Sequence, residues 1–137
     1  MSNFWQFFST LEEHIMTSKI SILFVDDEES LRILVPNQLN MEGFAVDTAD
    51  DGDTAVQMLA KKTYDVVLLD IRMPRMNGIE VLKHLRDKKI TSRVVMLTGV
   101  DDLTVALEAI KNGANDYVTK PYDLTTLIAC ISRVAAK

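Results

Sequence analysis

Five short apolar runs alternate with five helical patterns along this chain, and this alternation constrains the fold more than any other feature. The apolar runs are rich in β-branched residues and span residues 20–25, 44–49, 64–69, 93–98 and 114–119. Apolar residues at helical spacing predict helices over 29–42, 51–62, 78–88, 101–112 and 123–136. Strands that alternate with helices form βαβ units, and nearly continuous hydrophobic strands are covered on both faces. The sequence therefore predicts an α/β fold, with a doubly wound, five-stranded parallel sheet and five helices.

Composition and charge exclude several classes of protein. The 137 residues fit one domain, and the net charge of −5 argues against direct nucleic-acid binding, which needs a basic surface. The single cysteine, Cys130, rules out an internal disulfide framework. No apolar run approaches the roughly 20 residues that cross a bilayer, and the N-terminus lacks the pattern of a secretory signal. We therefore expect a cytoplasmic protein.

Chemically active side chains follow four of the five predicted strands. Asp26 and Asp27 follow the first strand, Asp70 follows the third, Thr98 ends the fourth, and Lys120 follows the fifth. In an open doubly wound sheet, the functional site lies at the carboxyl ends of the strands. Each of these residues alone could be an ordinary turn or helix-cap residue. Together they predict one pocket, provided that the first, third, fourth and fifth strands are neighbours.

The residue types in this pocket favour phosphoryl chemistry on a magnesium ion. Three close carboxylates repel one another unless a cation compensates their charge. Because no His or Cys accompanies them, a zinc site is disfavoured, whereas oxygen ligands suit Mg²⁺. Lys120 and the metal would neutralise phosphoryl oxygens, and Thr98 would donate a hydrogen bond. A carboxylate can itself be the nucleophile, and Asp70, alone at the end of the central strand, is the candidate.

Four motifs make the chain resemble the receiver domain of two-component response regulators. They are ILFVDDE (22–28), VVLLDIRMPRMNG (66–78), VVMLTG (94–99) and DYVTKP (116–121). The resemblance covers about residues 19–137, and the D-x-x-M-P-x-x-x-G block is its most distinctive part. It implies a flavodoxin-like sheet with strand order 2-1-3-4-5.

The resemblance also implies roles for the residues of the pocket. Asp70 would accept the phosphoryl group. Asp27 would bind Mg²⁺ directly, with support from Asp26, and the backbone carbonyl of Arg72 would be a further metal ligand. Lys120 would pair with the phosphoryl group or with Asp70.

A conformational response and its partners are implied in the same way. Thr98 would move to bond the phosphoryl group, Tyr117 would follow it, and the peptide bond before Pro121 would be cis. The phosphoryl donor would be a phosphohistidine on a sensor histidine kinase or a phosphotransfer protein. The face formed by residues 98–123 would then switch and control a downstream effector protein or domain. Arg72 flanks the entrance for attacking water and would tune the lifetime of the aspartyl phosphate.

Residues 1–18 form an extension before the receiver domain, which we assign to residues 19–137. Aromatic and aliphatic residues within 2–16 share one helical stripe, which predicts an amphipathic helix. This helix could pack on its own domain, pair with a second copy or lie in a membrane interface; its few cations argue against membrane contact. Residues 1–15 could also reflect a misassigned start upstream of Met16. Homodimerisation through this helix or through the last helix–strand–helix segment stays open.

Two other functions are disfavoured by the motifs. Phosphatases with an aspartate nucleophile resemble a D-x-D-x-T pattern, and here Arg72 stands where their second acid belongs. A plain interaction module would lack the acid pair, the nucleophile or the lysine. We therefore expect a signalling phosphoacceptor that promotes its own phosphorylation and dephosphorylation, and no other enzymatic activity. Because the chain stops where the last predicted helix ends, it is either a stand-alone regulator or a receiver cut from a longer protein.

Overall fold

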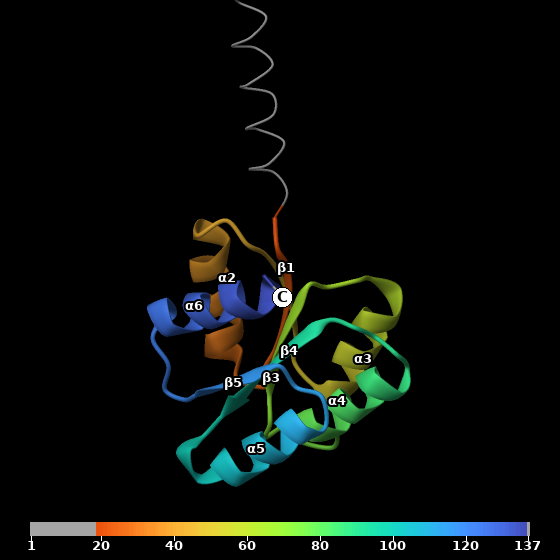
Figure 1. Cartoon of the computed structure of the whole chain (residues 1–137). Helices are drawn as coiled ribbons and strands as arrows, with labels where there is room; N and C mark the ends of the chain where they lie inside the picture. The colour runs from red at the N-terminus through yellow and green to blue at the C-terminus, as the bar shows by residue number, and fades with distance from the viewer. Residues whose placement is uncertain (1–18, 137) are drawn as a thin grey trace, which may run out of the picture.

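The computed structural model describes residues 19–136, and they form a parallel five-stranded sheet between two layers of helices (Figure 1). The strands are β1 (Ser21–Val25), β2 (Ala45–Ala49), β3 (Val66–Asp70), β4 (Arg93–Thr98) and β5 (Asp116–Thr119). Their order is β2-β1-β3-β4-β5, and every neighbouring pair is parallel. This confirms the predicted fold class and strand order. The predicted N-terminal helix lies outside the described residues.

Five α-helices cover the two faces of the sheet. They are α2 (Glu29–Met41), α3 (Gly52–Lys61), α4 (Gly78–Asp87), α5 (Leu103–Lys111) and α6 (Leu124–Ala135). Figure 1 shows α2 and α6 on one face and α3, α4 and α5 on the other. Within residues 19–136, no helix is both long enough and apolar enough to cross a membrane.

The start of α5 differs from the sequence prediction. A single 3₁₀ turn, η1 (Val100–Asp102), precedes α5, so the α-helix begins two residues later than predicted. The N–H of Asp102 donates to the carbonyl oxygen of Gly99 at 3.0 Å, which is the tighter hydrogen-bond pattern of a 3₁₀ turn. This turn matters because it directly follows Thr98 and Gly99 at the edge of the sheet.

The central strand explains why the apolar runs are nearly continuous. All five residues of β3 are buried. Val67 and Leu69 pack into the cluster that also contains residues of α3, α4 and α5, whereas Val66 and Leu68 pack into the cluster under α2 and α6. Because successive side chains of a strand point to opposite faces, a strand covered on both sides needs an apolar residue at every position. The strand therefore holds its last residue, Asp70, on a fixed backbone.

The start of α4 is packed directly against the end of β3. Asn77 caps this helix by accepting from the N–H of Glu80 at 2.9 Å, and a reciprocal contact completes a capping box. A Cβ atom on the next residue, Gly78, would lie 2.3 Å from the carbonyl oxygen of Asp70. Only glycine permits this close approach, so Gly78 fixes how the helix meets the strand that carries Asp70.

Candidate phosphoacceptor site

Three carboxylates meet at the carboxyl edge of β1 and β3. Asp26, Asp27 and Asp70 each offer an oxygen atom within 4.8 Å of the other two. The register of the sheet accounts for part of this: Val25 is paired with Leu69, so the next residues, Asp26 and Asp70, come side by side. Asp26 and Asp70 are buried, whereas Asp27 is exposed. Two residues that are 44 positions apart in the sequence thus share one pocket because their strands are parallel neighbours.

Lys120 reaches this cluster from the end of β5. Its Nζ lies 2.9 Å from Asp26 Oδ2 and 3.4 Å from Asp70 Oδ1. The family resemblance implies a pairing with Asp70 or with a phosphoryl group; the contact with Asp70 is present, and a shorter contact with Asp26 accompanies it. The N–H of Lys120 donates to the carbonyl oxygen of Thr98 at 2.6 Å, and the peptide bond between Lys120 and Pro121 is cis. The ammonium group thus contacts both buried carboxylates.

The electrostatics of the cluster leave Asp70 short of positive charge. Burial raises the pKa of Asp70 to about 6, and the charges of Asp26 and Asp27 push it in the same direction, while Lys120 opposes them. Burial alone would lower the pKa of Lys120, but the hydrogen bond to Asp26 and the charges of Asp70 and Asp26 outweigh it, so this pKa is raised. The ammonium group therefore stays charged, and it contacts two of the three carboxylates, Asp26 and Asp70.

A hard divalent cation fits this set of donors. The cluster consists of carboxylate oxygens alone, the ligands that Mg²⁺ takes through one or two side chains while it keeps several waters. A cation would also oppose the burial and, to a lesser degree, the neighbouring carboxylates that raise the pKa of Asp70. The residues present therefore match a magnesium site in both ligand type and charge.

Thr98 and Tyr117 lie on neighbouring strands beside the cluster. β3 and β4 pair Asp70 with Leu97, so Thr98 stands one residue further along the same edge. Thr98 is buried, and its hydroxyl donates to the carbonyl oxygen of Gly99 at 3.1 Å. Tyr117 is half-buried on β5 and packs against the cluster shared with α5. The structure thus places Thr98 at the edge of the site, where its carbonyl oxygen accepts from the N–H of Lys120, and places Tyr117 on the adjacent strand, paired with Met96.

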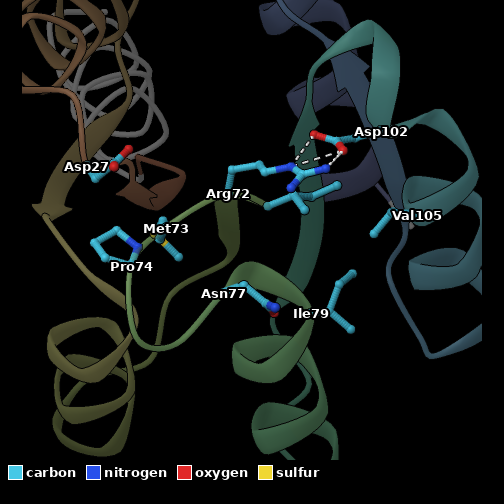
Figure 2. Close-up of a pocket in the computed structure, with 9 residues that line it drawn as sticks. Asp27, Arg72, Met73, Pro74, Asn77, Ile79, Asp102 and Val105 are labelled. Carbon is cyan, nitrogen blue, oxygen red and sulfur yellow. Dashed lines mark hydrogen bonds and ion pairs between the residues drawn. The ribbon is translucent and has the colours of Figure 1, made fainter.

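One interaction at the site was not predicted from the sequence. Figure 2 shows Arg72 extending from the loop after β3 to Asp102 at the end of η1. Arg72 Nε lies 3.1 Å from Oδ1 and 3.0 Å from Oδ2 of Asp102, and a terminal nitrogen also bonds to Oδ1. The hydrogen bond from Arg72 lowers the pKa of Asp102, and the reverse contact raises the pKa of Arg72. In the sequence, Asp101 and Asp102 resemble ordinary residues at the start of a helix. A helix needs only one of them as its N-cap, and the second aspartate is the only sequence signal of an ion pair with Arg72.

The pair closes one side of a cavity that also contains a residue of the acid cluster. The cavity has a volume of about 490 Å³, and Asp27, Arg72 and Asp102 line it. The other lining residues come from the loop after β3 and from the helices that follow: Ile71, Met73, Pro74, Asn77, Ile79 and Val105. Arg72 therefore lines the same cavity as Asp27, one of the three residues of the acid cluster.

Tyr122 is a further residue that motif reasoning did not assign to the site. Within residues 19–136, its hydroxyl is buried and receives no hydrogen bond from another protein group. Burial raises the pKa of Tyr122, and the charges of Asp26 and Asp70 add to this effect. No sequence motif assigns Tyr122 to the site, because an aromatic residue two positions after Lys120 is equally expected in the hydrophobic core.

The family of the chain follows from comparison with known proteins. A family model for the response regulator receiver domain matches residues 22–132. The regulatory protein AtoC of Escherichia coli (strain K12) is 40% identical over 118 residues, which are 86% of this chain and 26% of AtoC. The alkaline phosphatase synthesis transcriptional regulatory protein PhoP of Bacillus subtilis (strain 168) is 40% identical over 101 residues, which are 74% of this chain and 42% of PhoP. The chain thus spans less than half the length of either relative.

Solved structures give the same result. The receiver domain of NtrX from Brucella abortus has a TM-score of 0.80 and 33% sequence identity, and the match covers 85% of this chain and 98% of that domain. A structure described as FixJ-N has a TM-score of 0.81 and 34% identity, with coverage of 87% and 95%. The chain belongs to the response regulator receiver domains, the signalling phosphoacceptor family of two-component systems.

Proposed function

We propose that Asp70 accepts a phosphoryl group from a phosphohistidine on a sensor histidine kinase or a phosphotransfer protein. The observation that carries this assignment is the position of Asp70. It ends the fully buried central strand, within 4.8 Å of two other carboxylates and 3.4 Å from the ammonium group of Lys120. A nucleophile held on a rigid strand is already placed for in-line attack, which lowers the entropic part of the barrier.

The transfer requires only groups that the site and the donor supply. An Asp70 carboxylate oxygen forms a bond to phosphorus while the phosphorus–nitrogen bond of the donor breaks. The electron pair of that bond stays on the imidazole nitrogen, which takes up a proton. Asp26, Asp27, Asp70 and the backbone carbonyl of Arg72 would hold Mg²⁺, which supplies positive charge for the phosphoryl oxygens. Lys120, whose Nζ lies 3.4 Å from Asp70 Oδ1, adds a second positive charge.

The response begins at Thr98 in this proposal. Its hydroxyl now donates to the carbonyl oxygen of Gly99. A phosphoryl oxygen is a stronger, charged acceptor, so the hydroxyl turns to it, and Tyr117 fills the space that Thr98 leaves. The phosphoryl group favours the switched state only because this state gives it a contact that the other lacks.

We infer that the face formed by α5, β5 and α6 meets the effector. Three apolar side chains of α5 are exposed, namely Leu103 at 39%, Leu107 at 55% and Ile110 at 37%. Exposed apolar groups on one helix are typical of a surface that a partner covers. The partner is an effector protein, an effector domain or a second copy of this chain. The division into an extension over residues 1–18 and a receiver over 19–137 belongs to the same proposal.

Labelling with acetyl phosphate tests the assignment of the nucleophile. With Mg²⁺ present, the wild-type protein should gain one acid-labile phosphoryl group, and Asp70→Asn should reduce labelling by at least about 100-fold, because its amide is not a nucleophile. Asp65→Asn is the matched control, since Asp65 is an exposed carboxylate near the other end of β3. Undiminished labelling of Asp70→Asn would refute the assignment.

Lys120→Ala separates chemistry from response. Lys120 bonds to Asp26 and Asp70, so its loss should uncouple residual phosphorylation from the conformational change. Amide chemical shifts of residues 98–123, compared with and without acetyl phosphate, measure that change. A wild-type shift pattern in phosphorylated Lys120→Ala would show that Lys120 has no part in the response.

A further inference from the structure

The ion pair between Arg72 and Asp102 joins the two segments that border the phosphoryl site. Arg72 lies two residues after Asp70, in the loop that leads to α4. Asp102 ends η1, which begins immediately after Thr98 and Gly99. Nε and a terminal nitrogen of Arg72 both bond to the carboxylate of Asp102. The pair therefore links the segment after the nucleophile to the segment after the switch residue.

The two partners differ in their access to water. The side chain of Asp102 is only 7% exposed, whereas that of Arg72 is 76% exposed. Asp102 precedes α5 but makes no side-chain hydrogen bond that caps this helix. The carboxylate is thus satisfied by Arg72 rather than by the helix it precedes. Because a buried carboxylate without a partner is costly, Asp102 depends on Arg72 far more than Arg72 depends on Asp102.

We propose that Asp102 is a positioning residue that holds the guanidinium group of Arg72 at η1, and that a phosphoryl group on Asp70 competes with Asp102 for it. This inference rests on the proposed role of Asp70. Arg72 and Asp27 line the same cavity, Asp27 offers an oxygen within 4.8 Å of one on Asp70, and Arg72 follows Asp70 by two residues. A phosphoryl group carries more negative charge than a carboxylate, and it can accept two parallel hydrogen bonds from arginine.

Loss of Arg72 to the phosphoryl group changes the surroundings of Asp102. The carboxylate would then lose its bidentate partner, and η1 would lose the contact that ties it to the loop after β3, so that η1 can move. The N–H of Asp102 donates to the carbonyl oxygen of Gly99, so movement of η1 also pulls on the residue that follows Thr98. Occupancy of the phosphoryl site is thereby coupled to η1 and to the start of α5, in addition to any movement of Thr98 itself.

Competition predicts opposite effects for the two members of the pair. With magnesium beryllofluoride as a non-covalent phosphoryl mimic, Asp102→Asn should bind the mimic about fivefold more tightly than the wild type, because Arg72 is released to it. Arg72→Met should bind about fivefold more weakly, since the mimic loses a bidentate partner. In the double variant Arg72→Met/Asp102→Asn, the gain from Asp102→Asn should vanish. A purely structural ion pair would instead move both single variants in the same direction.

Arg75→Met is the matched control for this series. Arg75 lies in the same loop and pairs with Asp51 at 3.0 Å, away from η1, so its substitution should leave the affinity for the mimic unchanged. Arg72→Lys serves if Arg72→Met does not fold, because it keeps the positive charge but loses the bidentate contact; its affinity should lie between those of Arg72→Met and the wild type. Asp102→Asn removes no helix cap, and thermal unfolding checks that it is folded.

Amide chemical shifts of residues 99–106 provide a second readout. In Asp102→Asn without the mimic, these shifts should lie part of the way toward their positions in the wild-type complex. Unchanged affinity and unchanged shifts in Asp102→Asn, or equal losses in both single variants, would overturn this inference alone. Failure of the wild type to bind the mimic, or full binding by Asp70→Asn, would instead overturn the proposed role of Asp70.

Discussion

The two ends of the same parallel sheet differ in what their carboxylates contact. At the amino end, the carboxylate of Asp65 accepts from the N–H of Ser21 at 2.8 Å and from its hydroxyl at 3.1 Å. The hydroxyl of Ser92 there donates to the carbonyl oxygen of Tyr64 at 2.6 Å. At the carboxyl end, three carboxylates lie close together, one ammonium group contacts two of them, and burial raises the pKa of Asp70 to about 6. One end pairs acids with neutral donors, whereas the other places acids against acids.

This difference separates stability from function. Hydrogen bonds between neutral donors and an exposed acid stabilise the sheet whether or not any ligand is present. Carboxylates that repel one another destabilise the fold until a cation or a phosphoryl group changes the charge balance. The carboxyl end is therefore the part of the sheet where binding can shift a conformational equilibrium, and the following substitutions test this contrast.

The largest effect should come from the packing that fixes the carboxyl end. Gly78→Ala places a Cβ atom 2.3 Å from the carbonyl oxygen of Asp70, so the start of α4 or the end of β3 must move. We expect urea unfolding to show a loss of about 3 kcal/mol, at the upper end for an overpacked site. Gly99→Ala is the control, since its Cβ would meet nothing closer than an Asp102 oxygen at 3.8 Å. Equal stability of the two variants would show that the close approach of α4 is not required.

The next effect has the opposite sign. Asp70→Asn should raise the free energy of unfolding by about 2 kcal/mol at pH 7 in EDTA, because it removes a carboxylate whose ionisation is unfavourable in the folded state. Folded Asp70 holds its proton up to a pKa of about 6, whereas the unfolded residue loses it near 3.8, the usual pKa of an aspartate. The wild type therefore loses stability relative to Asp70→Asn as the pH rises from about 4 to 7.

Urea unfolding of both proteins between pH 3.5 and 7.5 measures this difference. The two curves should coincide at the acid end and separate through the pKa of Asp70. A wild type that is more stable than Asp70→Asn at pH 7, or a difference in stability that does not change with pH, would mean that ionisation of Asp70 does not destabilise the folded state.

Metal binding should recover part of the stability that the acid cluster costs. Mg²⁺ at ten times its dissociation constant should stabilise the wild type by about 1.4 kcal/mol relative to EDTA. Asp27→Asn removes a carboxylate of the cluster and should abolish most of this gain, whereas Asp65→Asn at the other end should keep it. Thermal unfolding with and without Mg²⁺ measures the effect, and an equal gain in all three proteins would point to non-specific binding.

The smallest effect should arise at the amino end. Asp65→Ala removes the acceptor for two hydrogen bonds from Ser21 and should lower the free energy of unfolding by about 1 kcal/mol. Labelling by acetyl phosphate should stay at the wild-type level, because this edge has no part in the chemistry. Reduced labelling of Asp65→Ala, with its stability unchanged, would show that the amino end also takes part in phosphorylation.

The sequence predicts the fold and the composition of the site for the same physical reason. Strands buried on both faces must be continuously apolar, as Val66–Asp70 shows until its last residue, so they are visible without a structure. Once the strands are parallel, residues that follow them must meet at one edge, which brings Asp70 and Lys120 together. Patterns of hydrophobicity thus carry information about which end of each strand a residue occupies.

Contacts between loops are not encoded in this way. Arg72 and Asp102 are 30 positions apart, and their contact depends on the paths of two loops and on the 3₁₀ turn that no apolar pattern announces. The shorter contact of Lys120 with Asp26 depends likewise on side-chain placement rather than on spacing. The close approach of Gly78 to the carbonyl oxygen of Asp70 likewise becomes visible only in three dimensions.

Identification of the phosphorylated residue tests the central claim most directly. Borohydride reduction converts an aspartyl phosphate to homoserine, and trypsin cleavage after Lys62 and Arg72 yields a single peptide, residues 63–72, that contains both Asp65 and Asp70. Fragmentation of this peptide by mass spectrometry therefore compares the two ends of the sheet in one molecule. We predict homoserine at position 70 after treatment with acetyl phosphate and Mg²⁺. Homoserine at position 65, at position 26 or 27, or at no position would contradict the assignment of Asp70.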